Sequence, residues 1–373
     1  MTTPLTVGAR ALQQLDDALA ATSVHDERAR LLALRVQTLA RMRRQDEAQA
    51  ALRGLQRLVG TQPSATSHAW MLFAQACQQY FAGQLREALA TFDDCARLAS
   101  NLGLVTLAAQ ARSAQAFAHL QLDDLGAAIR ACMTVRVLGA GAGPAALYQL
   151  HLALGSIRQT GGDLVGALGH FERALSCAHE AGDLLAVSAI NTRAAGLHAW
   201  HARKAVALGA TDATERAASA LKLLDEAIAA AAADQTHAVL PELELLRGGM
   251  LRLLRRCDEA LAAFERFIPI ALEHGLRDDA LLASADRALC LLSLGRTDEA
   301  LAVARAAVDG RANAHEHEIR AIALENLATV LQAGAAAGDE PARLRAEAAA
   351  QWEAARRKQA DALAAALEDM GEN

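Results

Sequence analysis

Alanine recurs along this sequence at a nearly constant interval. Seven alanines follow one another at steps of 40, 40, 39, 53, 40 and 40 residues. Self-similarity with a period of about 20–50 residues is typical of stacked structural repeats, so this spacing constrains the architecture more than any local motif does. The seven positions are Ala48, Ala88, Ala128, Ala167, Ala220, Ala260 and Ala300.

Two further positions keep the same register. The residue twelve places before the alanine is small in nearly every repeat, and the residue four places after it is mostly larger and apolar. Two helices cross closely only where a small side chain lies at the crossing, and a larger neighbour then fills the space beside it. The register therefore predicts antiparallel helix pairs. The earlier position holds Val36, Ala76, Ala116, Gly155, Gly248 and Ala288, and the later one Leu52, Phe92, Cys132, Phe171, Leu224, Phe264 and Ala304.

Composition supports a fold made only of helices. Hydrophobic residues make up 53% of the chain, mostly as the helix formers alanine and leucine, and no segment alternates apolar and polar residues over the length of a strand. We predict about 16 to 18 helices and no β-strand. The single step of 53 residues predicts an insertion of about 13 residues between two helices, around 201–215, where Gly209 to Asp212 favour a loop.

The predicted domain organisation is one all-α solenoid of about seven to eight helix pairs spanning 1–373. Residues 26–334 carry the repeats. Residues 1–25 are predicted to form an N-terminal capping helix, and 341–370 a C-terminal one. The C-terminal helix has an alternative role, in which it projects toward a partner.

Two stretches resemble the tetratricopeptide repeat. One runs from Leu154-Gly155 through Gly162-Asp163-Leu164, Ala167 and Phe171 to Ala174-Leu175, and the other is Glu325-Asn326-Leu327-Ala328. The period near 40 is similar to that of the longer-helix variety found in bacterial signalling regulators. The resemblance implies a right-handed superhelix whose concave groove binds a protein or peptide.

Sequence patterns of catalysis and cofactor binding are absent. There is no phosphate-binding loop, no nucleophile elbow and no H-E-x-x-H. His198 and His201 have no third metal ligand in sequence reach, so we predict neither a metal nor a cofactor nor an enzyme. A net charge of −6 disfavours nucleic acid as a partner. Six cysteines without a C-x-x-C, no apparent signal peptide and no membrane-like segment predict a cytoplasmic protein, whose oligomeric state stays open.

The few aromatic residues indicate a candidate binding surface. Trp70, Phe73, Cys77 and Tyr80 are spaced 3, 4 and 3 residues apart, so they share one face of a predicted helix. The resemblance implies that this face lines the concave groove, where aromatic side chains anchor a partner. The alternative is that the stripe merely packs against the neighbouring repeat. The predicted partner-binding residues are Trp70, Phe73, Tyr80, Gln110, Phe117, Gln149 and, by resemblance to peptide sensors, Asn191.

Three functional hypotheses follow. The first is a non-enzymatic scaffold or regulatory adaptor that binds a protein or peptide. The second is a module that senses a ligand or signalling peptide and controls a separate signalling enzyme or transcription regulator. The third is the regulatory part of a signalling enzyme whose catalytic domain lies elsewhere.

Overall fold

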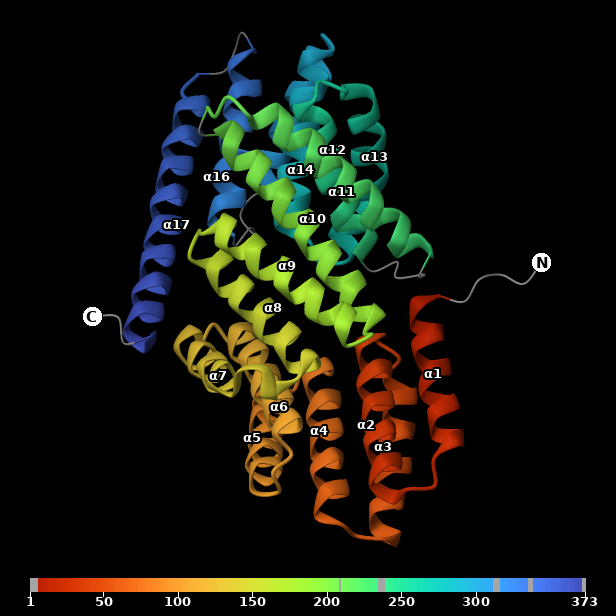
Figure 1. Ribbon diagram of the computed structural model, residues 1–373. Helices are drawn as coiled ribbons and strands as arrows, with labels where there is room; N and C mark the ends of the chain where they lie inside the picture. Colours follow the sequence, from red (N-terminus) through yellow and green to blue (C-terminus); the bar gives the residue numbers. More distant parts are fainter. Residues whose placement is uncertain (1–5, 208, 234–238, 311–315, 335–337, 371–373) are drawn as a thin grey trace, which may run out of the picture. The chain divides into compact units, whose positions relative to one another are not determined.

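The computed structural model describes residues 6–207, 209–233, 239–310, 316–334 and 338–370 (Figure 1). Within these ranges it contains 17 α-helices and one short 3₁₀-helix, and no strand, which confirms the all-α prediction. The helices form an α-solenoid of antiparallel pairs. Two compact units are present: unit 1 comprises residues 1–190 with 361–373, and unit 2 comprises 191–360.

Unit 1 begins with a single helix and continues as four helix pairs. In each pair we call the first helix A and the second B. The A helix packs against its own B helix and the A helix of the next pair, as α2 does against α3 and α4. The elements are α1 (Val7–Ala21), α2 (His25–Arg41), α3 (Gln45–Thr61), α4 (Ala65–Phe81), α5 (Leu85–Asn101), α6 (Val105–Gln121), α7 (Leu125–Leu138), η1 (Gly139–Ala142), α8 (Pro144–Thr160) and α9 (Leu164–Glu180).

Unit 2 continues the same arrangement, beginning within α10. The long step in the repeat was predicted to be a loop insertion, and this is wrong in detail. The extra residues mostly lengthen α10 to 24 and α11 to 21 residues, against 17 in a typical helix of the array such as α2. The elements are α10 (Leu184–Ala207), α11 (Ala213–Ala233), α12 (Leu240–Leu253), α13 (Cys257–Glu273), α14 (Arg277–Ser293), α15 (Thr297–Gly310), α16 (His317–Gln332) and α17 (Glu340–Met370).

The register read from the sequence is confirmed at the helix crossings. All seven marked alanines are fully buried. A Cβ atom added at Gly155 would lie 2.4 Å from Cε1 of Phe171, and one added at Gly248 would lie 2.6 Å from Cε1 of Phe264. In these two pairs the glycine of the A helix therefore lies directly against the phenylalanine of its B helix, which explains why the two positions recur together.

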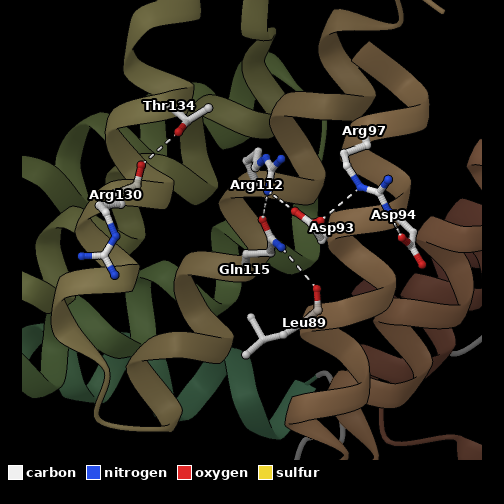
Figure 2. A network of polar contacts seen from close by, with 8 residues as sticks. All are labelled: Leu89, Asp93, Asp94, Arg97, Arg112, Gln115, Arg130 and Thr134. Atoms are coloured by element: carbon white, nitrogen blue, oxygen red, sulfur yellow. Dashed lines mark hydrogen bonds and ion pairs between the residues drawn. The ribbon is translucent and has the colours of Figure 1, made fainter. Parts of the chain in front are cut away.

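Polar side chains fix neighbouring pairs against each other. Arg112 on α6 pairs with Asp93 on α5 at 2.7 Å (Figure 2). Its Nη1 also donates to Oε1 of Gln115 at 2.8 Å, and Nε2 of Gln115 donates to the carbonyl oxygen of Leu89 at 3.2 Å. Both polar ends of the Gln115 amide are thus satisfied, and the second and third pairs are joined through α5 and α6.

The C-terminal helix packs along α16 within unit 2. Leu344 and Ala348 are buried in the shared core. Nε1 of Trp352 donates to Oε1 of Glu325 at 2.9 Å, and Arg320 forms an ion pair with Glu347 at 2.6 Å. Through these contacts the first part of α17 covers α16, the last A helix of the array.

A buried charge network joins four A helices of unit 2. The carboxylate of Asp286 on α14 is inaccessible to solvent and pairs with Arg203 on α10 at 2.7 Å and with Arg252 on α12 at 2.8 Å. Nδ2 of Asn326 on α16 donates to the same carboxylate at 3.0 Å. A Cβ atom at Gly249 would lie 1.8 Å from Nη2 of Arg203, so only glycine leaves room for this guanidinium. The network holds two cations against one deeply buried anion.

A histidine pair between α8 and α9 predicts acid sensitivity. Nδ1 of His151 lies 3.1 Å from Nδ1 of His170. Burial, the charge of His151, and the charges of Arg158 and Arg173 lower the pKa of His170 to about 4, against a smaller opposing effect of Asp163. Because the unfolded chain then binds a proton that the folded chain does not, stability falls as the pH drops from about 6.5 towards 4. We expect His170→Gln to flatten this dependence, as measured by melting temperature between these pH values. An equally steep loss in the variant would contradict the assignment.

Candidate functional site

Three of the predicted binding residues occupy one register position on successive A helices. Trp70 on α4, Gln110 on α6 and Gln149 on α8 each lie six residues before the small residue of their helix crossing. We call these three residues the A-helix row. Because α6 packs against α8, equivalent positions on them belong to neighbouring parts of the same array.

The two glutamines of the A-helix row carry unused hydrogen-bond acceptors. Gln110 is only 7% exposed, and its Oε1 is buried without a hydrogen-bond partner in the described part of the chain. Oε1 of Gln149 is likewise buried without a hydrogen-bond partner among the described residues, while Nε2 of Gln149 donates to the hydroxyl of Tyr148 at 3.4 Å. A buried polar atom without a partner costs about 1–3 kcal/mol, so its presence requires an explanation.

Gln115 shows that the fold can satisfy a buried glutamine on the same helix. It lies on α6 and is 6% exposed, which closely matches the burial of Gln110. Its oxygen accepts from Arg112 and its nitrogen donates to Leu89 (Figure 2). The unpaired oxygen of Gln110 is therefore a property of its position and does not follow from burial on α6 alone.

The aromatic stripe divides between the core and the surface. The expectation that Phe73 presents its ring to a partner is not supported by its environment, since the residue is fully buried and its ring packs against Phe92 at 6.1 Å. Three residues span less than one helical turn, so the side chains of Trp70 and Phe73 point in different directions around the helix axis and meet different neighbours. Trp70 is half-buried, with its ring edge-on to Phe73 at 5.9 Å.

The remaining predicted residues lie apart from the A-helix row. Tyr80 is half-buried near the end of α4, where its hydroxyl accepts from Nε2 of Gln121 at 2.6 Å. Phe117 is half-buried and packs against the core of the third and fourth pairs. Asn191 is exposed on α10, at the first residue of unit 2.

A contact that sequence reasoning missed joins the first pair of unit 1 to the end of its fourth. Nη1 of Arg41, the last residue of α2, donates to Oδ2 of Asp183 at 2.7 Å, although 142 residues separate them. The hydroxyl of Tyr148 on α8 donates to the same oxygen at 3.0 Å. Oδ1 of Asp183 accepts the backbone N–H of Ala186 and thereby caps α10. We call Arg41, Tyr148 and Asp183 the clasp.

The electrostatics of the clasp favour its charged form. Burial alone raises the pKa of Asp183, but the charge and hydrogen bond of Arg41, with the bonds from Ala186 and Tyr148, outweigh it and hold the pKa below its usual value. Burial raises the pKa of Tyr148 to about 12, so its hydroxyl keeps its proton and donates. The turn at Gly182-Asp183 was visible in the sequence, but its pairing with Arg41 depends on the curvature of unit 1.

The arrangement is suited to holding hydrogen-bond donors. The amide oxygens of Gln110 and Gln149 have acceptor capacity that no described donor uses, and the half-buried ring of Trp70 offers apolar surface at the equivalent position. Among the described residues, no group of three or more His, Cys, Asp or Glu side chains is placed to hold a metal ion. No helix in the described ranges is long and apolar enough to span a membrane.

Comparison with known proteins supports the fold class. No protein-family model matches the chain, and neither does any curated protein. Solved structures do match, and the fold is that of proteins containing tetratricopeptide repeats. One is a signal transduction ATPase with a tetratricopeptide repeat sensor from Pyrococcus horikoshii, at 12% identity and a TM-score of 0.56. The match covers 93% of this chain and 53% of the ATPase, so the chain spans about half the length of that protein.

A second match has nearly the same length as the chain. It is a Rap protein complexed with competence and sporulation factor, at 13% identity and a TM-score of 0.53, covering 91% of this chain and 99% of the other. At such low identity, both matches establish the α-solenoid fold and leave the function to be argued from the site.

Proposed function

We propose that this protein is a non-enzymatic regulatory adaptor that binds an extended peptide or protein segment through the A-helix row of unit 1. The observation that carries the proposal is the pair of unpaired, buried amide oxygens at Gln110 and Gln149. Main-chain N–H groups of an extended segment are the donors that such acceptors fit, because every residue except proline supplies one. Trp70 at the equivalent position would add an aromatic anchor.

The fold and the thiols are consistent with this proposal. The Rap protein of the same fold was solved with a bound factor, which shows that such a solenoid can hold a ligand. All six cysteines are free, which suits a reducing compartment such as the cytoplasm.

A second candidate function is a sensor module that controls a separate signalling enzyme or transcription regulator. The Pyrococcus protein, in which a repeat sensor accompanies an ATPase, favours this candidate. Both functions use the same ligand-binding step and differ in what the bound form controls. Capture of a signalling enzyme that depends on the ligand would favour the second.

Gln110→Met is expected to change stability and binding in opposite directions. Methionine removes an unpaired buried oxygen at similar volume, so we expect the free energy of unfolding to rise by about 1 kcal/mol. Loss of the acceptor should weaken peptide binding by about tenfold. Peptides selected from a phage-displayed random library on the wild-type protein serve as the probe. Melting temperature and peptide affinity are measured on the same preparations.

Gln115→Met is the matched control on the same helix. Its amide is fully hydrogen-bonded, so we expect lower stability with peptide affinity unchanged in the folded protein. Trp70→Ala should lower affinity more than tenfold, with some loss of stability because the ring is half-buried. A Gln110→Met variant that binds the selected peptides as tightly as wild type would rule out the A-helix row, and a library that yields no binder would count against peptide binding itself.

A further inference from the structure

The clasp connects parts of unit 1 that the helix pairs alone would leave independent. Successive A helices touch through packing of neighbouring pairs, whereas Arg41 and Asp183 meet across three pair-to-pair junctions. The side chains of both residues are only partly buried, at 18% and 25% exposure. The ion pair is therefore mostly buried, and the exposed fraction of each side chain gives water access to it when the pair separates.

The clasp is linked directly to the A-helix row. The hydroxyl of Tyr148 donates a hydrogen bond to Asp183 and accepts one from Nε2 of Gln149, the next residue along α8. Cys77 lies on the same face of α4 as Trp70, about two turns further along, and the charge of Arg41 acts on the pKa of its thiol. A change at the clasp therefore reaches two of the three helices that carry the row.

The acceptors that a ligand would need are buried while the clasp is closed. Gln110 is 7% exposed and its Oε1 is fully buried, so an N–H group cannot reach this oxygen in the conformation described. A ligand that uses it must enter while unit 1 is more open. The clasp holds the first pair to the end of the fourth and is bonded to Gln149 through Tyr148, so its release is a way to open the unit beside the A-helix row.

We propose that the clasp is a gate on the A-helix row, which releases Arg41 from Asp183 to admit a ligand and closes again around it. The gate rests on the proposed function for the identity of its ligand, but the opening of the clasp occurs without a ligand. The gate therefore has a test that does not depend on any peptide.

Cys77 supplies a native probe of opening. It is 3% exposed and lies on α4, which packs against the helix that carries Arg41, and burial raises the pKa of its thiol. Arg41→Gln, which removes the ion pair, is expected to speed alkylation of Cys77 by N-ethylmaleimide about fivefold, and Tyr148→Phe, which removes one hydrogen bond to Asp183, is expected to speed it less. Peptide mapping by mass spectrometry assigns the modified cysteine. Loss of the Arg41 charge by itself would raise the thiol pKa and slow the reaction, so faster labelling reports exposure.

Two controls separate gate opening from general loosening. Cys95, fully buried on α5, should react at the wild-type rate in both variants. Arg35→Gln removes an ion pair from the same helix, with Asp16 at 2.8 Å, and should leave Cys77 labelling unchanged. Unchanged Cys77 labelling in either clasp variant overturns the gate, and so does an equal acceleration at Cys95.

Binding kinetics then test the gate with a ligand. With a peptide selected on the wild-type protein, Arg41→Gln should raise the association rate constant about fivefold, because the open form is more populated. An unchanged association rate despite faster Cys77 labelling would show that the opening does not control entry, and would overturn the gate. If no peptide is selected at all, the proposed function fails, while the thiol labelling still decides whether the clasp opens.

Discussion

Asp286→Ala is expected to destabilise unit 2 by about 3–5 kcal/mol, because it leaves buried guanidinium charge without its carboxylate. Arg203 is 2% exposed in its side chain and has no route to solvent without repacking against Gly249. Chemical denaturation of the purified protein measures the change. The expected result is an earlier transition for unit 2, with unit 1 unaffected if the units unfold separately.

The stability cost of Asp286→Ala is compared with that of breaking an exposed ion pair and with that of removing all charges of the buried network. Glu259→Ala removes the partner of Arg256 at an exposed site, and its cost should be below about 1 kcal/mol. Replacing all three charges of the network together, by Arg203→Met and Arg252→Met with Asp286→Leu, should recover much of the loss because no buried charge stays unpaired. Equal costs for Asp286→Ala and Glu259→Ala would show that the network is not buried in solution.

Gly155→Leu is expected to destabilise unit 1 by about 3 kcal/mol or more, at the upper end of what overpacking costs. Even a single added carbon would lie 2.4 Å from the ring of Phe171, and a leucine adds three more. Phe171→Leu in the same chain should relieve part of the strain, since a smaller side chain then faces the larger one. Melting temperature and denaturant midpoint are the measurements.

Gly169 is the matched control for this crossing. It lies in the interior of α9, two residues from Phe171, and a Cβ atom there would meet nothing within 4 Å. Gly169→Ala should therefore stabilise the helix by about 0.5–1 kcal/mol. A Gly155→Leu variant that melts like wild type would mean that the crossing is not formed as described.

The fold could be predicted from the sequence because each repeat reports the same physical constraint. Ala88 and Ala260 lie 172 residues apart, yet both must be small for the same reason, and the spacing of such residues carries the register. The insertion near residue 209 was harder to interpret, since the glycine there predicts a turn without showing how far α10 and α11 extend on either side. Helix length depends on packing partners, which lie outside the local window.

The candidate site could be predicted only in part. Gln110 and Gln149 were found because the register aligns them with Trp70, but their unpaired oxygens depend on three-dimensional packing. The spacing of Phe73 predicts a face shared with Trp70, and the resemblance implies that this face lines the groove, whereas the ring of Phe73 is buried beside Phe92. The clasp had no sequence signal, because nothing local links Arg41 to a turn 142 residues away.

The paired small and large residues at the crossings also determine the smallest segment of this architecture that can be exchanged or duplicated as a unit. In the fourth pair glycine faces phenylalanine, while in the first pair Val36 takes the place of the glycine and Leu52 that of the phenylalanine. A recombination point in the turn after a B helix transfers both members of a crossing together. A point between A and B separates them, and would join a valine to a phenylalanine that has no room for it. Duplication and shuffling of such an array are therefore confined to whole helix pairs, which is consistent with a period that stays near 40 residues while the individual sequences diverge.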